Sequence, residues 1–124
     1  MYRFYNPNPV GRTTVGDCSV RAISKALGIS WDEAHEELSQ TSKQMGDIMN
    51  SNDVISAVLR HNGFYKEGLP CTYKHCFTVR EFAEENPVGT YVVGTGTHVV
   101  TIINGDYFDA WPSGDESVIY FWTK

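Results

Sequence analysis

The chain is organised around residues 15–23, which read Val15-Gly16-Asp17-Cys18-Ser19-Val20-Arg21-Ala22-Ile23. This stretch places a cysteine directly after Gly-Asp, at the point where a helical pattern begins. A thiol in the first turn of a helix lies among free backbone N–H groups and at the positive end of the helix macrodipole. Such a setting lowers the thiol pKa and favours the reactive thiolate. Cys18 is therefore a candidate nucleophile, which would need a base and an orienting group from elsewhere in the chain.

Helical patterns continue through much of the chain after Cys18. Several stretches combine apolar residues at helical spacing with helix start or stop signals. We expect helices from Cys18 to Leu27, after the Ser30 capping box, between Asn50 and Gly63, and between Thr78 and Asn86. Residues 64–77 contain aromatic residues together with Gly and Pro, and this composition predicts a loop that borders a groove.

The pattern changes from helix to strand after Pro87. Residues 91–93, 98–103, 106–111 and 118–122 have the composition of β-strands and are separated by turn residues. Asn104-Gly105, between the second and third of these stretches, is the strongest short-range signal for a β-hairpin. Helices first and antiparallel strands second predict one α+β domain covering residues 1–124.

The predicted hairpin allows a geometric test of which residues share a face. If Asn104-Gly105 forms a two-residue type I′ loop, counting outward from the loop places His98 opposite Trp111. Residues opposite each other, and residues two apart on one strand, point to the same face. His98 and Asp109 then become diagonal neighbours, with Cβ atoms roughly 5.5–8 Å apart. Trp111 would stand beside His98 as a wall of the site, and a one-residue slip would separate His98 from Asp109.

Cys18, His98 and Asp109 together supply the parts of a nucleophilic site. A thiol at a helix start, an imidazole on a strand and a carboxylate on the next strand can act as nucleophile, base and orienting group. Cys18 would attack a carbonyl, and His98 would take the thiol proton and later protonate the leaving group. Asp109 would fix the imidazole tautomer. A cysteine that merely packs the core is the alternative for Cys18 alone.

Composition and charge restrict the class of protein. The 124 residues carry a net charge of −5, and their Arg and Lys residues form no basic stripe, which argues against a nucleic-acid partner. No stretch resembles a signal peptide or a membrane span, so we expect a cytoplasmic protein with no membrane partner. The three cysteines, an odd number, make a poor disulfide framework and fit a reducing compartment.

Cys71, His75 and Cys76 raise the alternative of a zinc-dependent interaction domain. Their spacing offers three ligands, whereas a closed structural zinc site normally needs four, and no obvious fourth ligand is nearby. Buried thiols or a labile disulfide are the favoured interpretation of this segment. We therefore expect no metal and no cofactor.

Three short motifs carry a family resemblance. Gly16-Asp17-Cys18 opens a predicted helix, Thr97-His98-Val99-Val100 lies on a predicted strand, and Asp109-x-Trp111 follows a predicted hairpin. Their order and their predicted elements resemble the papain-like cysteine peptidase superfamily, and most closely its small bacterial and phage-type members. The resemblance covers nearly all of the chain. It implies N-terminal helices, a Cys-bearing helix packed on a small C-terminal antiparallel sheet, and a Cys-His-Asp catalytic triad.

One position departs from the pattern of this superfamily. Its members usually carry Gln or a similar donor shortly before the cysteine, and here that position is Arg12. We expect the side chain of Asn6 or Asn8 to stabilise the oxyanion instead, together with the backbone N–H of Cys18. Asp17 is expected to contribute to the wall of the site.

The function that follows from these features is cysteine-dependent hydrolysis. We expect a peptidase or isopeptidase that acts on a peptide or protein substrate through an acyl-thioester on Cys18. Acyl transfer to an amine would use the same three residues and is an open alternative. A papain-like binding or regulatory module without turnover is the other alternative, because the usual oxyanion donor is replaced by Arg12.

Overall fold

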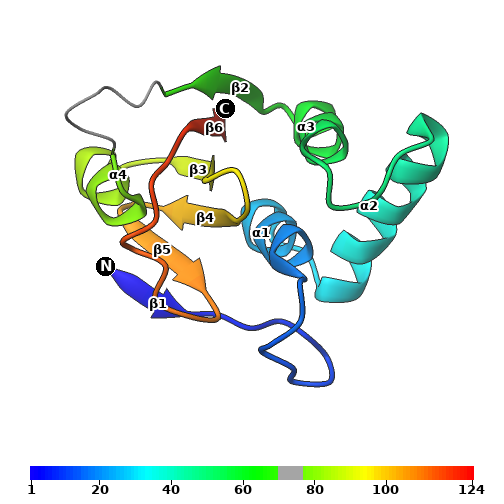
Figure 1. The fold of residues 1–124 in the computed structure, drawn as a ribbon, viewed down its shortest axis with the longest axis horizontal. Coiled ribbons are helices and arrows are strands. Elements are labelled where there is room, and N and C mark those ends of the chain that lie inside the picture. Colours follow the sequence, from blue (N-terminus) through cyan, green and yellow to red (C-terminus); the bar gives the residue numbers. More distant parts are fainter. Residues whose placement is uncertain (70–76) are drawn as a thin grey trace.

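The computed structural model describes residues 1–69 and 77–124 as a mixed α+β domain (Figure 1). Its helices are α1 (Cys18–Leu27), α2 (Trp31–Met45), α3 (Asn52–His61) and α4 (Val79–Glu85). Its strands are β1 (Tyr2–Phe4), β2 (Tyr65–Gly68), β3 (Thr90–Gly94), β4 (Val99–Ile103), β5 (Asp106–Asp109) and β6 (Tyr120–Thr123). The α+β class predicted from the sequence is confirmed.

Local capping signals determine where the helices begin and end. α1 ends at Gly28, which adopts the left-handed conformation with φ 67° that favours glycine at this position. α2 begins with a capping box in which the Ser30 side chain accepts from the Glu33 N–H and the Glu33 side chain accepts from the Ser30 N–H. Thr78 and Glu81 form the same reciprocal pair at the start of α4. These short-range signals are why the four helices lie where the sequence predicts them.

The six strands form one sheet in the order β1-β5-β4-β3-β6-β2. The β4–β5 hairpin has the predicted register, since Ile103 pairs with Asp106 across the loop. Asn104 and Gly105 have φ values of 50° and 83°, the positive values that a type I′ turn requires. Because the register is correct, Asp109 lies at the end of β5 beside the start of β4, where His98 is located.

Two strands extend the sheet beyond the four that the sequence predicts. β1 pairs in parallel with β5, and β2 pairs antiparallel with β6, so the expectation of a purely C-terminal antiparallel sheet is wrong. β2 falls within residues 64–77, which the composition predicts to be a loop. Both strands are short edge strands. β2 is exposed throughout and has no alternation of apolar residues, and β1 covers only Tyr2–Phe4, too short a stretch for alternation to identify a strand. The backbone N–H of Tyr5 continues the β1 contact by donating to the Asp109 carbonyl at 2.8 Å.

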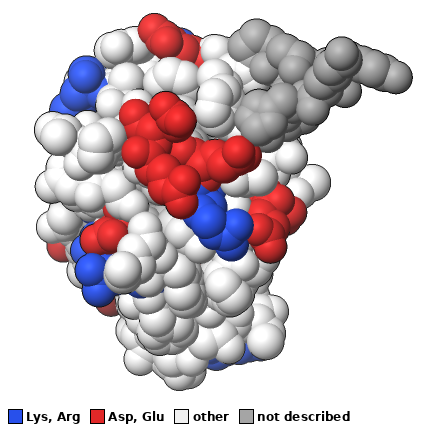
Figure 2. All heavy atoms as spheres, turned by 90° about the vertical axis from the view of Figure 1, so that its left-hand side faces the viewer, with Lys and Arg blue, Asp and Glu red and all other residues white. Residues whose placement is uncertain are grey.

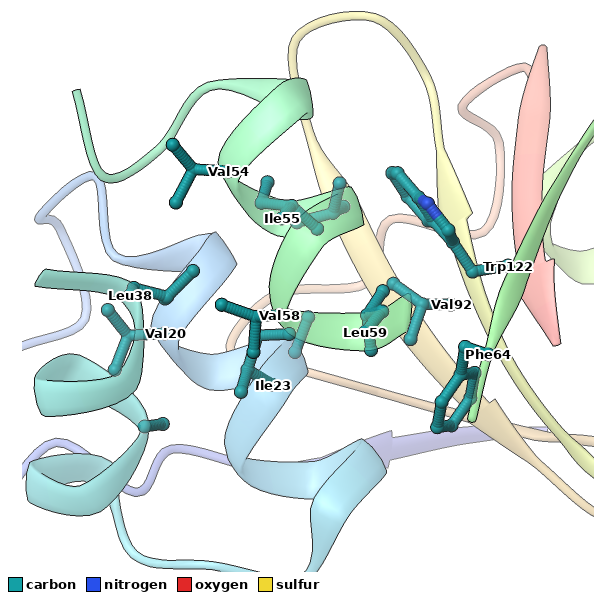
Figure 3. Close-up of a cluster of buried hydrophobic side chains, with 13 residues drawn as sticks. Val20, Ile23, Leu38, Val54, Ile55, Val58, Leu59, Phe64, Val92 and Trp122 are labelled. Carbon is teal, nitrogen blue, oxygen red and sulfur yellow. The ribbon is translucent and has the colours of Figure 1, made fainter. Parts of the chain in front are cut away.

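Two hydrophobic clusters pack on the sheet. α1, α2 and α3 bury one cluster against β3 and β6, with side chains such as Ile23, Leu59 and Trp122 directed toward one another (Figure 3). α4 covers the other cluster, which includes Val93, Val100 and Tyr107. α1 is fixed to the sheet by a buried hydrogen bond, in which Thr101 Oγ1 of β4 donates to the Ala22 carbonyl at 2.7 Å. This packing holds the N-terminus of α1 near the start of β4, next to His98.

Within the described ranges, no helix combines the length and the hydropathy needed to cross a bilayer.

Candidate active site

Cys18 is the first residue of α1, and its thiol is partly buried. Asp17 occupies the N-cap position but makes no capping hydrogen bond to the helix, and the first turn contains no acidic residue. The partial positive charge of the helix N-terminus is therefore not neutralised by a side-chain cap. The backbone of Val99, the first residue of β4, supplies a hydrogen bond that stabilises the thiolate.

His98 joins Cys18 to Asp109. Its Nε2 lies 2.7 Å from Asp109 Oδ2. The imidazole also interacts with the Cys18 thiol by hydrogen bonding and by charge. Because Nε2 faces the carboxylate, Nδ1 is the ring nitrogen left for the sulfur. The structure thus brings together the three residues that the sequence singled out.

Charge and hydrogen bonding shift the pKa of both members of the Cys18–His98 pair. Burial by itself raises the pKa of the Cys18 thiol, but hydrogen bonds from His98 and the Val99 backbone, with the charges of His98 and Arg21, lower it below its ordinary value. Burial lowers the pKa of His98, but the contacts with Asp109 and Cys18 outweigh it and raise that pKa to about 9. At neutral pH both shifts favour a thiolate facing an imidazolium.

Asp109 is fully buried and receives several hydrogen bonds. Ser113 Oγ donates to its Oδ2 at 2.5 Å, and the backbone N–H of Ala110 donates to its Oδ1 at 2.8 Å. Burial raises the pKa of this carboxyl, whereas hydrogen bonds from His98 and Ser113 and the charges of His98 and Arg21 lower it, and the net direction is downward. Asp109 is therefore a fixed carboxylate beside the imidazole.

Arg21 is a buried partner of this carboxylate that the sequence analysis missed. Its Nη2 lies 2.9 Å from Asp109 Oδ1, its Nε donates to the same oxygen at 3.1 Å, and its Nη1 donates to Asp17 Oδ1 at 2.9 Å. Only 4% of Arg21 is exposed. The i, i+4 spacing of Asp17 and Arg21 on the helix was a signal that could have found their ion pair. The sequence offers no comparable signal for the contact with Asp109.

Asp17 supports the site from behind rather than lining the space beside the thiol. Its Oδ2 accepts hydrogen bonds from Trp31 Nε1 at 3.0 Å and from Asn8 Nδ2 at 3.2 Å. Together with the Arg21 contact, these bonds connect Asp17 to α2 and to the segment before α1. The carboxylate holds the start of α1 in place and is itself buried.

Trp111 stands beside His98, where the hairpin register predicts it. The two ring centroids are 4.9 Å apart and the rings are inclined by 40°. Trp111 is 41% exposed, so it covers one side of the imidazole while its outer face meets solvent. It can shield the His98–Asp109 hydrogen bond from water on that side.

Asn6 and Asn8 lie on the segment that approaches α1. Asn6 Nδ2 donates to the Arg12 carbonyl at 3.2 Å, and Asn8 Nδ2 donates to Asp17 Oδ2. Asn8 Oδ1 accepts from the Val10 N–H at 2.9 Å, which fixes the orientation of this amide. The Asn8 amide is thus anchored to the residue next to Cys18, and one of its two N–H bonds has no partner in this arrangement. The oxyanion role of either residue stays a prediction.

A hollow of about 290 Å³ lies over the thiol and the imidazole. The described residues that line it carry no charge apart from the Cys18–His98 pair; they are Cys18, Ser19, Ile48, Asn50, Asn52, Ile55, Gly96, Thr97, His98, Val99 and Tyr120. The Tyr120 hydroxyl donates to Asn52 Oδ1 at 2.9 Å. The Tyr120 ring lies so close to Gly94 that a Cβ there would approach its Cε2 to 1.9 Å. Tyr120 is therefore a fixed wall of the hollow.

Cys71, His75 and Cys76, considered above as zinc ligands, lie outside the described residues. Among the residues that are described, no group of three or more His, Cys, Asp or Glu side chains is placed to hold a metal ion.

Comparisons of the chain with protein-family models, with curated proteins and with solved structures gave no match. What the site can do chemically therefore follows from its own geometry.

Proposed function

We propose that this protein is a cysteine-dependent hydrolase, most simply a peptidase or isopeptidase, with Cys18, His98 and Asp109 as its catalytic triad. The observation that carries this proposal is the convergence of a helix-terminal thiol of lowered pKa with an imidazole held at 2.7 Å from a buried carboxylate. Sites of this composition perform acyl transfer through a covalent intermediate. The uncharged hollow beside the thiol offers room for the acyl group.

In the first step the Cys18 thiolate attacks the carbonyl carbon of the substrate and a C–S bond forms. The oxyanion that develops is stabilised by the backbone N–H of Cys18 at the start of α1. The Asn8 amide, which donates to Asp17 beside Cys18 in the sequence, is the side chain that we expect to add a second donor. When the tetrahedral intermediate collapses, His98 Nδ1 gives its proton to the leaving amine. An acyl-thioester and a neutral imidazole remain.

In the second step the neutral His98 accepts a proton from water, and the resulting hydroxide equivalent attacks the thioester. Collapse of this second intermediate breaks the C–S bond, releases the carboxylic acid and regenerates the thiolate–imidazolium pair. Asp109 keeps Nε2 protonated throughout, so that Nδ1 is the nitrogen that exchanges protons. Acyl transfer to an amine would follow the same course with an amine in place of water.

A papain-like domain is the fold that fits this proposal. The order Cys, His, Asp along the chain, the helix that opens at the cysteine and the sheet that carries the histidine support it. The comparisons gave no match, so membership of that superfamily rests on these features and on the three sequence motifs.

Selective alkylation tests the proposal directly. At neutral pH, iodoacetamide should label Cys18 ahead of Cys71 and Cys76, as read by peptide mass spectrometry. His98→Ala should remove the selectivity, because the imidazolium that lowers the thiol pKa is lost. Equal labelling of the three cysteines in the wild type would contradict the proposal. A Cys18→Ala variant provides the blank for every activity assay.

The alternative function is a binding module that does not turn over its ligand. It is favoured by the local engagement of the Asn6 and Asn8 amides, which leaves fewer donors for an oxyanion than the superfamily usually has. This alternative predicts a wild type that is alkylated at Cys18 but does not hydrolyse an activated thioester such as thiophenyl acetate.

A further inference from the structure

The hollow beside the thiol adjoins a second hollow on the other side of the α1 N-terminus. The second hollow has a volume of about 360 Å³. Ser19, Ile48 and Asn50 line both hollows. The two hollows are therefore neighbours that share one wall, and a peptide bound beside the thiol can extend a side chain into the second hollow.

The shared wall is the connection between α2 and α3, and hydrogen bonds keep it in one conformation. Asp47 Oδ1 accepts from the Ile48 N–H at 2.7 Å, and its Oδ2 accepts from Ser51 Oγ at 2.9 Å. This arrangement presents Ile48 outward, where 67% of the residue is exposed. Ile48 is therefore free to contact a side chain that enters the second hollow.

The second hollow is lined largely by apolar and aromatic groups. Its apolar residues are Val15, Val20, Trp31, Ile48 and Met49. The Trp31 ring stacks on His35, with 5.1 Å between the ring centroids. Such a surface suits an apolar side chain more than a hydrated one.

Charge is almost absent from the lining of the second hollow. Asp17 is the only Asp, Glu, Lys or Arg among the described residues that line it, and Asp17 is paired with Arg21. Acidic side chains gather on the face of the molecule that carries α4 (Figure 2), and on α2 the residues Asp32, Glu33, Glu36 and Glu37 line a separate hollow. A charged substrate group in the second hollow would lose hydration, and the lining offers only the Asp17–Arg21 pair in return.

We propose that the second hollow is a specificity site that receives an uncharged, apolar side chain of a peptide substrate, such as Leu, Met or Phe. The proposal rests on the hydrolase function above and adds a substrate class to it. Trp31, Ile48 and Met49 contact the bound side chain and favour it by burying its apolar surface.

A panel of internally quenched peptides tests this specificity. Each position near a central Ala–Gly bond is in turn Leu, Lys or Glu, and kcat/KM is measured for every peptide. At one position we expect the Leu peptide to exceed both the Lys and Glu peptides by about tenfold or more. Thiophenyl acetate, which has no side chain to enter the second hollow, reports the triad separately.

Ile48→Glu should weaken the preference by placing a carboxylate at the rim. The ratio of the Leu to the Lys peptide should fall about tenfold or more. Because Ile48 also lines the hollow beside the thiol, each kcat/KM is compared with the hydrolysis of thiophenyl acetate by the same variant. Val88→Glu is the matched control, because Val88 is 77% exposed, lines neither hollow and receives the same added charge. This control should keep the wild-type ratio.

Equal kcat/KM values for the Leu, Lys and Glu peptides would overturn the specificity site, provided that the wild type hydrolyses thiophenyl acetate. An unchanged ratio in Ile48→Glu would overturn it as well. A wild type that hydrolyses neither the thioester nor any peptide would instead remove the hydrolase function, and the specificity site with it.

Discussion

Arg21 Nη2 lies 2.9 Å from Asp109 Oδ1, so an ion pair joins two residues that are 88 positions apart. Arg21 belongs to the helix that carries the thiol, and Asp109 holds the imidazole. The pair therefore fixes the position of the helix that carries Cys18 relative to the carboxylate that holds His98. Because both side chains of the pair are buried, removing either one would leave the other as an unpaired buried charge.

Loss of Arg21 should destabilise the protein strongly. Arg21→Gln would leave Asp17 and Asp109 buried without their counter-charge, and we expect the free energy of unfolding to fall by about 3–5 kcal/mol. Urea unfolding followed by circular dichroism measures this change. Arg3→Gln is the matched control, since the Arg3–Asp106 ion pair is exposed and its loss should leave the unfolding midpoint nearly unchanged. Similar midpoints for the two variants would contradict the structural role of Arg21.

The alkylation rate of Cys18 should depend on pH in a way that reveals its lowered pKa. Thiolate is the reacting form, so the rate should remain high at pH values well below about 8.5, where a free cysteine has lost most of its thiolate. In His98→Ala the hydrogen bond and the positive charge are gone, and the midpoint of the rate profile should move to higher pH. Stopped-flow alkylation with iodoacetamide gives both profiles, and coincident midpoints would rule out the thiolate–imidazolium pair.

Hydrolysis should be lost at both ends of the pH range for different reasons. At low pH the Cys18 thiolate takes up a proton, and the nucleophile disappears below its lowered pKa. At high pH His98 loses its proton as the pH passes its raised pKa of about 9, and the leaving amine is no longer protonated. We therefore expect a bell-shaped profile of kcat/KM for a peptide amide, with an alkaline limb near pH 9.

Asp109→Asn tests whether His98 controls the alkaline limb of this profile. Loss of the carboxylate removes the contact that raises the His98 pKa, so the alkaline limb should move to lower pH. A limb that stays in place would show that His98 does not control it. Thermal unfolding of the same variant identifies any part of the activity loss that comes from destabilisation.

Gly94 should tolerate no side chain, because the Tyr120 ring occupies the space that a Cβ would take. Gly94→Ala should displace Tyr120 from the wall of the hollow and lower the free energy of unfolding by about 1–3 kcal/mol. Gly68→Ala is the matched control, a strand glycine whose added Cβ would meet nothing within 4 Å. Chemical denaturation compares the two, and equal stability would contradict the described position of Tyr120.

The parts of the structure that the sequence predicts are those set by local chemistry. Asn104-Gly105 fixes the hairpin register through its backbone conformation, and that register brings Asp109 beside His98. The capping boxes and Gly28 fix the helix boundaries in the same way. The placement of His98 beside Asp109 could therefore be inferred from the sequence.

The parts that the sequence misses depend on contacts between distant segments. Nothing near Arg21 indicates that its guanidinium reaches Asp109, since only the packing of α1 on the sheet brings them together. β1 and β2 lie at the edges of the sheet, where β2 has no apolar alternation and β1 is only three residues long. The amides of Asn6 and Asn8 find partners that no local pattern specifies.

The segment from Tyr5 to Asp17 is connected at both ends to Asp109. Tyr5 donates its N–H to the Asp109 carbonyl, and Asp17 reaches the Asp109 carboxylate through Arg21. Lengthening a loop whose two ends are held in place costs little conformational entropy, about 0.6 kcal/mol for each doubling of its length. Designers could therefore graft longer or different sequences between residues 9 and 14, and the two attachments to Asp109 would remain in place.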